Sequence, residues 1–144
     1  MSNELAVNFM SRDEHKSIKT LQQKIHQGNV QAGWWTDLDS NKDLAEECIK
    51  QTRFGKALVA EKLALIHSEV SESMEAARKD LMDDKLPHRK GIEVELADAV
   101  IRILDLSGAL KLDLAGAILE KLAFNSIRPD HKIANRKATG GKSY

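Results

Sequence analysis

Residues 61–81 read EKLALIHSEVSESMEAARKDL and carry the strongest helical pattern in the chain. The apolar side chains recur at spacings of three and four residues, as they do where one face of a helix packs against a core. This pattern predicts a long helix over about residues 54–81. The side chains expected to face the core are Val59, Leu63, Ile66, Val70, Met74, Ala77 and Leu81.

Residues 88–110 carry a second helical pattern, which follows a polar break at residues 83–87. Apolar side chains again recur every three or four residues, so a second core-facing helix is predicted. The two stretches together predict a pair of long helices at the centre of the fold. The side chains of the second helix expected to face the core are Ile92, Leu96, Val100, Ile103 and Leu110.

Weaker helical signals lie on both sides of this pair. Ser11 opens a capping box for a first helix that is expected to stop near Gly28. A short helix is expected near residues 43–49, and Asp113 is the expected cap of the last helix. These signals predict an all-α fold, a bundle of four or five helices. The expected organisation is a single domain over 1–144, with 1–10 as an N-terminal arm and 130–144 as a basic tail.

Composition narrows the class of protein. The 144 residues have a formal net charge of zero, which does not favour a general nucleic-acid or membrane binder. Residues 1–10 lack the pattern of a signal peptide, and no apolar run approaches the roughly 20 residues that span a bilayer. The single cysteine, Cys48, excludes an intramolecular disulfide. We therefore expect a cytoplasmic protein that binds neither nucleic acid nor membrane.

Each of the two long helices carries a pair of acidic residues. Glu69 and Glu72 are three residues apart, as are Glu95 and Asp98, so each pair leaves one face of its helix. If the helices lie antiparallel, all four carboxylates can converge. Ionised acids a few ångströms apart repel one another unless cations lie among them. Oxygen ligands suit Mg²⁺ or Mn²⁺, so the motifs predict a magnesium site between two helices.

A row of polar side chains follows on the last predicted helix. Lys121, Asn125 and Arg128 recur at i, i+4 and i+7, which returns each to nearly the same helix face. A cation, an amide and a guanidinium in a row can hold successive phosphate oxygens. With the acids, the row predicts a site for a metal-bound polyphosphate.

The two acidic motifs, with 22 residues between them, resemble the signature of the MazG-like, all-α nucleoside triphosphate pyrophosphohydrolases. The later stretch Lys121-x-x-x-Asn125-x-x-Arg128-Pro129 is similar to a phosphate-binding stretch of that superfamily. The resemblance covers residues 54–144. The superfamily also includes dimeric dUTPases and phosphoribosyl-ATP pyrophosphohydrolases.

This resemblance implies an enzyme that hydrolyses a (deoxy)nucleoside triphosphate at the α–β bond to a monophosphate and pyrophosphate. It would cleanse the nucleotide pool or supply monophosphates in a prokaryotic cell or, if phage-encoded, in the host cytoplasm. Glu69 or Glu72 would accept the proton of the attacking water. A dimer or tetramer with a shared cleft is also implied. Two or more Mg²⁺ ions, replaceable by Mn²⁺, would be held by Glu69, Glu72, Glu95 and Asp98.

The chain departs from the common pattern of that superfamily at one position. Ser68 precedes Glu69, where many relatives have a second acidic residue, and this leaves the ion count open. Glu75 is a candidate substitute ligand. Arg102 lies four residues after Asp98, so it either pairs with that carboxylate or reaches a phosphate.

Other residues have two interpretations each. Trp34 and Trp35 either stack on a nucleobase or, for one of them, close the end of the bundle. Arg136 and Lys142 in the tail either close over the substrate or belong to a disordered segment, and partial ordering on binding is the favoured interpretation. Two further functions stay open: a dUTPase or phosphoribosyl-ATP pyrophosphohydrolase of similar architecture, and a non-catalytic helical interaction module whose acids are only surface.

Overall fold

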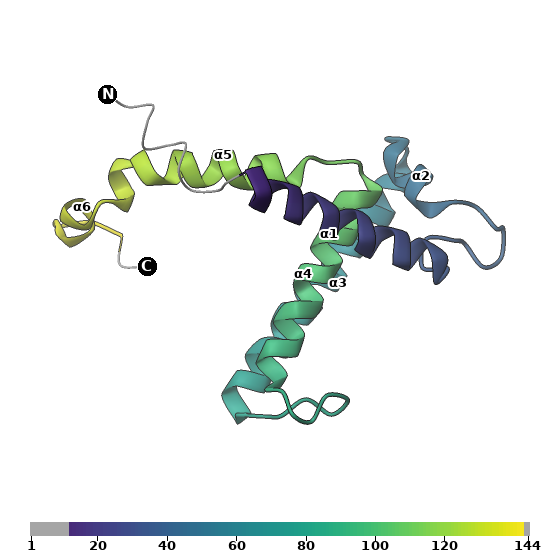
Figure 1. The fold of residues 1–144 in the computed structure, drawn as a ribbon, viewed down its shortest axis with the longest axis horizontal. Helices are drawn as coiled ribbons and strands as arrows, with labels where there is room; N and C mark the ends of the chain where they lie inside the picture. Colours follow the sequence, from purple (N-terminus) through teal and green to yellow (C-terminus); the bar gives the residue numbers. More distant parts are fainter. Residues whose placement is uncertain (1–11, 143–144) are drawn as a thin grey trace. The chain divides into compact units, whose positions relative to one another are not determined.

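The computed structural model describes residues 12–142, and regular structure in this range is entirely helical (Figure 1), as the sequence predicts. The predicted arm of residues 1–10 and the capping residue Ser11 lie outside the described residues. The sixth α-helix, beyond the four or five predicted, is a five-residue helix in the basic tail. The elements are α1 (Arg12–Gln31), α2 (Leu44–Ile49), α3 (Arg53–Lys79), α4 (Gly91–Ala109), α5 (Leu114–Ile127), the 3₁₀ helix η2 (Pro129–His131) and α6 (Ile133–Lys137).

The first helix ends later than predicted. Gly28 lies inside α1 and does not stop it. The chain leaves the helix at Gly33, which has a left-handed φ of 86°. The amide of Gly33 donates to the Val30 carbonyl, and the amide of Trp34 donates to the Asn29 carbonyl, each at 3.0 Å. A left-handed glycine of this kind satisfies the last helical carbonyls, so Gly33 ends α1 and directs the chain into the tryptophan pair.

Contacts divide the chain into two compact units, and each is described by itself. One unit comprises Leu21–Leu112 and holds the second half of α1 with α2, α3 and α4. The other contains the described residues of Met1–Thr20 and Asp113–Tyr144, which form the start of α1, then α5, η2 and α6. Within residues 12–142, no helix is both long enough and apolar enough to cross a membrane.

In the unit Leu21–Leu112, α3 and α4 run side by side in opposite directions, joined by a loop of residues 80–90 (Figure 1). An antiparallel bridge between Met82 and Lys90 closes the loop, and the Gly91 amide donates to the Leu81 carbonyl at 2.8 Å. A Cβ at Gly91 would lie 3.0 Å from the Ala76 Cβ, so the absent side chain permits a close approach of the two helices. The antiparallel arrangement on which the predicted acid site depends is therefore present.

The helix faces that pack together differ from the predicted ones. On α3, the buried side chains are Glu69, Ser73 and Ala76, whereas Val70 and Met74 are 49% and 60% exposed. Along a helix, one residue turns the direction of the side chain by about 100°, so the apolar stripe lies beside the contact with α4. The prediction that the whole stripe faces the core of the single chain was wrong. The other predicted core positions on these two helices that are exposed are Leu63, Ala77, Leu81, Leu96, Val100 and Ile103.

A small apolar core lies where α2, α3 and α4 meet. Its fully buried members are Trp35, Cys48, Leu106 and Ala109. Partly buried side chains of α2 and α3 pack around it, namely Leu44, Ala45, Leu58, Val59 and Ile66, with Leu110 after α4. Trp35 is only 2% exposed and fills the centre, which anchors the loop after α1 to the helix pair.

Candidate functional site

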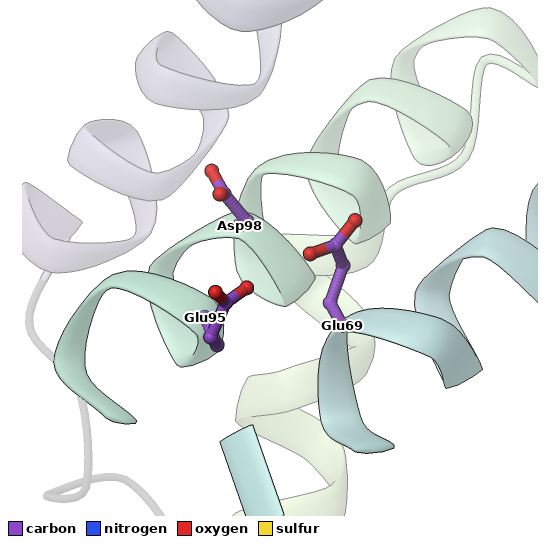
Figure 2. Close-up of side chains that lie close together, drawn as sticks. All are labelled: Glu69, Glu95 and Asp98. Carbon is purple, nitrogen blue, oxygen red and sulfur yellow. The ribbon is translucent and has the colours of Figure 1, made fainter. Parts of the chain in front are cut away.

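The helix pair brings three of the four predicted metal ligands together (Figure 2). α3 supplies Glu69, and α4 supplies Glu95 and Asp98 one turn apart. One oxygen atom from each carboxylate lies within 4.8 Å of the other two. Glu69 is buried and the other two are half-buried. Glu72 is exposed and lies outside this group of three, so its role as a ligand stays a prediction.

The surroundings of Glu95 raise the pKa of its carboxyl above the usual range. Removal of Glu95 from water is the largest cause, and the negative charge of Glu72 is the next. A hydrogen bond with Glu69 and the charges of Glu69 and Asp98 act in the same direction. Each of these makes an added negative charge at Glu95 unfavourable. A cation among these carboxylates would offset the repulsion between their negative charges.

Arg102 supplies a positive charge to the acid group. Its Nε atom donates to Glu69 Oε1 at 2.6 Å, which links α4 to α3. The sequence offered Asp98, on the same helix, as the partner, but the ion pair crosses between the helices. A buried carboxylate requires a partner of this kind, because an unpaired buried charge is costly. Arg102 therefore neutralises the most buried acid of the group.

The donor set of this site fits a hard divalent cation. All three groups are carboxylates, which suit Mg²⁺ and Mn²⁺. Oxygen ligands about 2.1 Å from Mg²⁺ lie roughly 3–4 Å from one another, so a small contraction of the group would place three of the oxygen ligands of an octahedral ion. Glu69, Glu95 and Asp98 are the residues that would hold such an ion.

A cavity of about 540 Å³ lies within the same unit and shares Asp98 and Arg102 with the acid site. Its volume is in the range of small-molecule sites, and its lining combines apolar and polar side chains. The cavity therefore offers space for an organic group next to the carboxylates. Its lining residues are Asn29, Trp34, Trp35, Leu44, Glu61, Lys62, Leu65, Asp98, Ile101, Arg102, Asp105 and Leu106.

The two tryptophans occupy different environments in this cavity. Trp34 is 68% exposed, so the faces of its indole are open to a ligand. Trp35 is buried in the core, and the Lys62 Nζ atom lies 4.5 Å from the centroid of its ring. Lys62 thus covers one face of Trp35, and Trp34 is the more accessible stacking surface. Base binding by either residue stays a prediction.

Asp105 forms a hydrogen-bond network that the sequence did not reveal. It is 8% exposed, and its Oδ1 atom accepts from Trp35 Nε1 at 2.9 Å and His26 Nδ1 at 2.8 Å. Its Oδ2 atom accepts from Asn29 Nδ2 at 2.7 Å. Its spacing of seven residues from Asp98 was the one available signal, since it places both acids on one face of α4. The network fixes the end of α1 and the tryptophan loop against α4.

The predicted phosphate-binding row belongs to the other unit. Lys121 and Arg128 lie over the ring of Phe124, with Nζ and Cζ at 5.0 and 5.7 Å from its centroid. Arg128 also donates two hydrogen bonds to Asp130, at 2.6 and 3.0 Å. The Oδ1 atom of Asn125 is buried without a partner among the described residues. Lys121 and Asn125 lie on α5, and Arg128 is its C-cap. The role of this row toward the acids stays a prediction.

The tail contributes further cations near Asp130. Lys142 Nζ donates to Asp130 Oδ2 at 2.6 Å, and Arg136 Nε donates to the Lys142 carbonyl at 3.3 Å. Arg128 and then Lys142 hold the pKa of the Asp130 carboxyl well below its usual range. These contacts connect Arg136 and Lys142 to Asp130 within their own unit. The predicted contact of Arg136 and Lys142 with a substrate stays a prediction.

Comparison with protein-family models, curated proteins and solved structures finds no match to this chain. The resemblance to the MazG-like superfamily therefore depends on the residues of the motifs alone.

Proposed function

We propose that the chain is a Mg²⁺-dependent pyrophosphohydrolase that cleaves a (deoxy)nucleoside triphosphate between the α- and β-phosphates. The observation that carries the proposal is the convergence of Glu69, Glu95 and Asp98 beside a cavity that Trp34 lines. Carboxylates suit the metal-bound triphosphate, and a cavity with an exposed indole suits the nucleoside. A site with both parts is typical of an enzyme that acts on a nucleotide.

The residues have distinct roles in this proposal. Glu69, Glu95 and Asp98 hold the ion, and exposed Glu72 lies close enough to influence Glu95. Bound Mg²⁺, or Mn²⁺ in its place, would lower the pKa of water and neutralise charge on the leaving pyrophosphate. Glu72 or Glu69 accepts the proton as water attacks the α-phosphorus and the bond to pyrophosphate breaks. The proposal keeps Lys121 and Arg128 as the cations, and Asn125 as the amide, that would bind phosphate oxygens.

The proposal includes a homo-oligomer, a dimer or tetramer. Apolar side chains at i, i+4 and i+7 of α4, namely Leu96, Val100 and Ile103, are exposed in the single chain. Three apolar side chains of α3 are also exposed, namely Leu63, Val70 and Met74. Two adjacent helices with exposed apolar stripes offer a larger apolar surface than scattered single residues, and such surfaces mark protein interfaces. A second copy that covers them would be positioned beside the acid site.

The test is incubation of the full chain with each common (d)NTP and Mg²⁺, followed by chromatography of the products. We expect a monophosphate and pyrophosphate, and no activity in EDTA. Glu95→Gln and Asp98→Asn should each lower turnover at least about 100-fold with little change in thermal stability, because each removes an oxygen ligand of a hard ion. Arg78→Met, a change at an exposed residue of α3, serves as the control.

The products distinguish the alternatives. Hydrolysis confined to dUTP or to phosphoribosyl-ATP would identify the related activities. A chain that releases no pyrophosphate and binds no Mn²⁺ in equilibrium dialysis would instead be an interaction module, and the proposed activity would be wrong.

A further inference from the structure

The side-chain amide of Asn29 is held in one orientation at the wall of the cavity. Its Nδ2 atom donates to Asp105 Oδ2 at 2.7 Å. A carboxylate accepts hydrogen bonds and does not donate them, so the NH₂ group of Asn29 must face Asp105. The other oxygen of Asp105 is held by Trp35, whose Nε1 atom is a donor only, and by His26. The network therefore decides which end of the Asn29 amide remains available.

The available end is the oxygen. Among residues 12–142, the only buried side-chain nitrogen or oxygen without a partner is Asn125 Oδ1, so Asn29 Oδ1 is accessible. The described residues offer it no hydrogen-bond donor. Asn29 lines the cavity that also contains Trp34 and reaches Asp98. The cavity wall thus presents a fixed hydrogen-bond acceptor.

We propose that Asn29 is a specificity-determining residue that selects nucleobases with an exocyclic amino group, cytosine or adenine, over their keto counterparts, uracil or hypoxanthine. Asp105 is the positioning residue that holds Asn29 in the selective orientation. This inference rests on the proposed function, since it assigns the cavity to the base of the nucleotide. In this proposal the exocyclic group of the base lies against the wall formed by Asn29. An amine donates to Asn29 Oδ1, whereas a ketone places oxygen against oxygen.

The first experiment compares matched pairs of substrates on the full chain with Mg²⁺: dCTP against dUTP, and dATP against dITP. Each pair differs only in this amino or keto edge of the base. We expect kcat/KM to favour the amino member about tenfold or more in at least one pair, since one buried polar group left unpaired has an effect of that size. Equal values within both pairs would overturn the proposal.

Asp105→Asn tests the positioning role. The amide introduced by this substitution has one oxygen, which Trp35 and His26 require as an acceptor, so its NH₂ group must face Asn29. The Asn29 amide then turns over and presents its own NH₂ to the cavity. We expect the amino preference to fall to about one or to reverse toward the keto member, a change that loss of stability alone would not produce. An unchanged ratio in a folded variant would overturn the role of Asp105.

Asn29→Ala provides a second test, which keeps the Asp105 carboxylate and removes only its hydrogen bond from Asn29. Asn29 is half-buried, and its removal should bring the kcat/KM values of the two members of each pair to about the same level, because neither meets the amide oxygen. Glu61→Gln is the matched control, because Glu61 is an exposed acceptor that also lines the cavity. Glu61→Gln should keep the wild-type ratio of kcat/KM between the amino and keto members. If Glu61→Gln abolishes the preference for the amino member and Asn29→Ala keeps it, the selection belongs to Glu61 and the proposal is overturned.

Binding of free nucleosides separates this inference from the proposed activity. Cytidine, uridine, adenosine and inosine carry the base without phosphates, and quenching of tryptophan fluorescence reports their binding near Trp34. If no triphosphate is hydrolysed but cytidine binds at least about fivefold more tightly than uridine, the inference holds and the proposed hydrolysis fails. If triphosphates are hydrolysed without preference and the nucleosides bind equally, the hydrolysis stands and the inference fails.

Discussion

Arg102 stabilises the acid site through an ion pair with Glu69. Its Nε atom lies 2.6 Å from an oxygen of the buried Glu69. We expect Arg102→Met to lower the free energy of unfolding by about 1–3 kcal/mol in EDTA, because Glu69 is left without its partner while half-exposed Arg102 moderates the effect. Urea denaturation measures the change. Arg78→Met, at an exposed pair with Glu75, should alter stability by less than about 0.5 kcal/mol.

The same variant reports on the metal site. If the acids hold Mn²⁺, saturation with Mn²⁺ should reduce the stability difference between Arg102→Met and wild type, because the ion replaces the missing positive charge. A difference that stays constant from EDTA to saturating Mn²⁺ would contradict the assignment of Glu69 as a ligand.

Single residues differ in how far the sequence predicts their role. Glu95 and Asp98 are identified by spacing within one helix, which is local information. Asp105 could not be identified in this way, because its partners Asn29 and Trp35 lie 76 and 70 residues earlier in the chain. Spacing along α4 places Asp105 on the face of Asp98, but it carries no information about which segment packs there.

Gly91 controls the approach of α3 and α4 at the element scale. A Cβ there would lie 3.0 Å from the Ala76 Cβ and 3.3 Å from the Leu81 carbonyl oxygen. We expect Gly91→Val to destabilise the protein by about 1–3 kcal/mol, because the added methyl groups must separate the helices. Thermal denaturation followed by circular dichroism measures the effect.

Gly28 provides the control for this substitution. It also lies in a helix, α1, but nothing lies within 4 Å of the position of its Cβ. Gly28→Ala should therefore leave stability unchanged or raise it by up to about 1 kcal/mol, through the better helix propensity of alanine. A Gly91→Val variant as stable as the wild type would show that the helix contact tolerates a wider separation.

The helices themselves were predictable because their signals are local. Asp113 caps α5 by accepting from the Gly116 amide at 3.0 Å, as the sequence indicates, and α3 and α4 follow the predicted ranges within a few residues. The packed faces were not predictable. An apolar stripe shows that a helix face avoids water, but it does not distinguish burial within one chain from burial against another molecule.

At the scale of the whole molecule, this uncovered stripe is the feature that the single chain does not explain. The contact between α3 and α4 buries Glu69, Ser73 and Ala76 of α3, which are polar or small. Two larger apolar side chains beside them, Val70 and Met74, are largely exposed in the single chain. An assembly that covers the stripe would bury apolar area that favours association by about 25 cal/mol per Å² before the costs of binding.

The prediction at this scale concerns the oligomeric state of the protein in solution. We expect sedimentation equilibrium of the wild-type chain to give a dimer or tetramer. Val100→Glu should shift the equilibrium toward the monomer by at least about tenfold, because a charge in an apolar interface must be desolvated without a partner. Leu38→Glu is the control: Leu38 is 88% exposed in the turn after α1 and lies outside α3 and α4. A monomeric wild type, or equal dissociation by both variants, would contradict an interface on these helices.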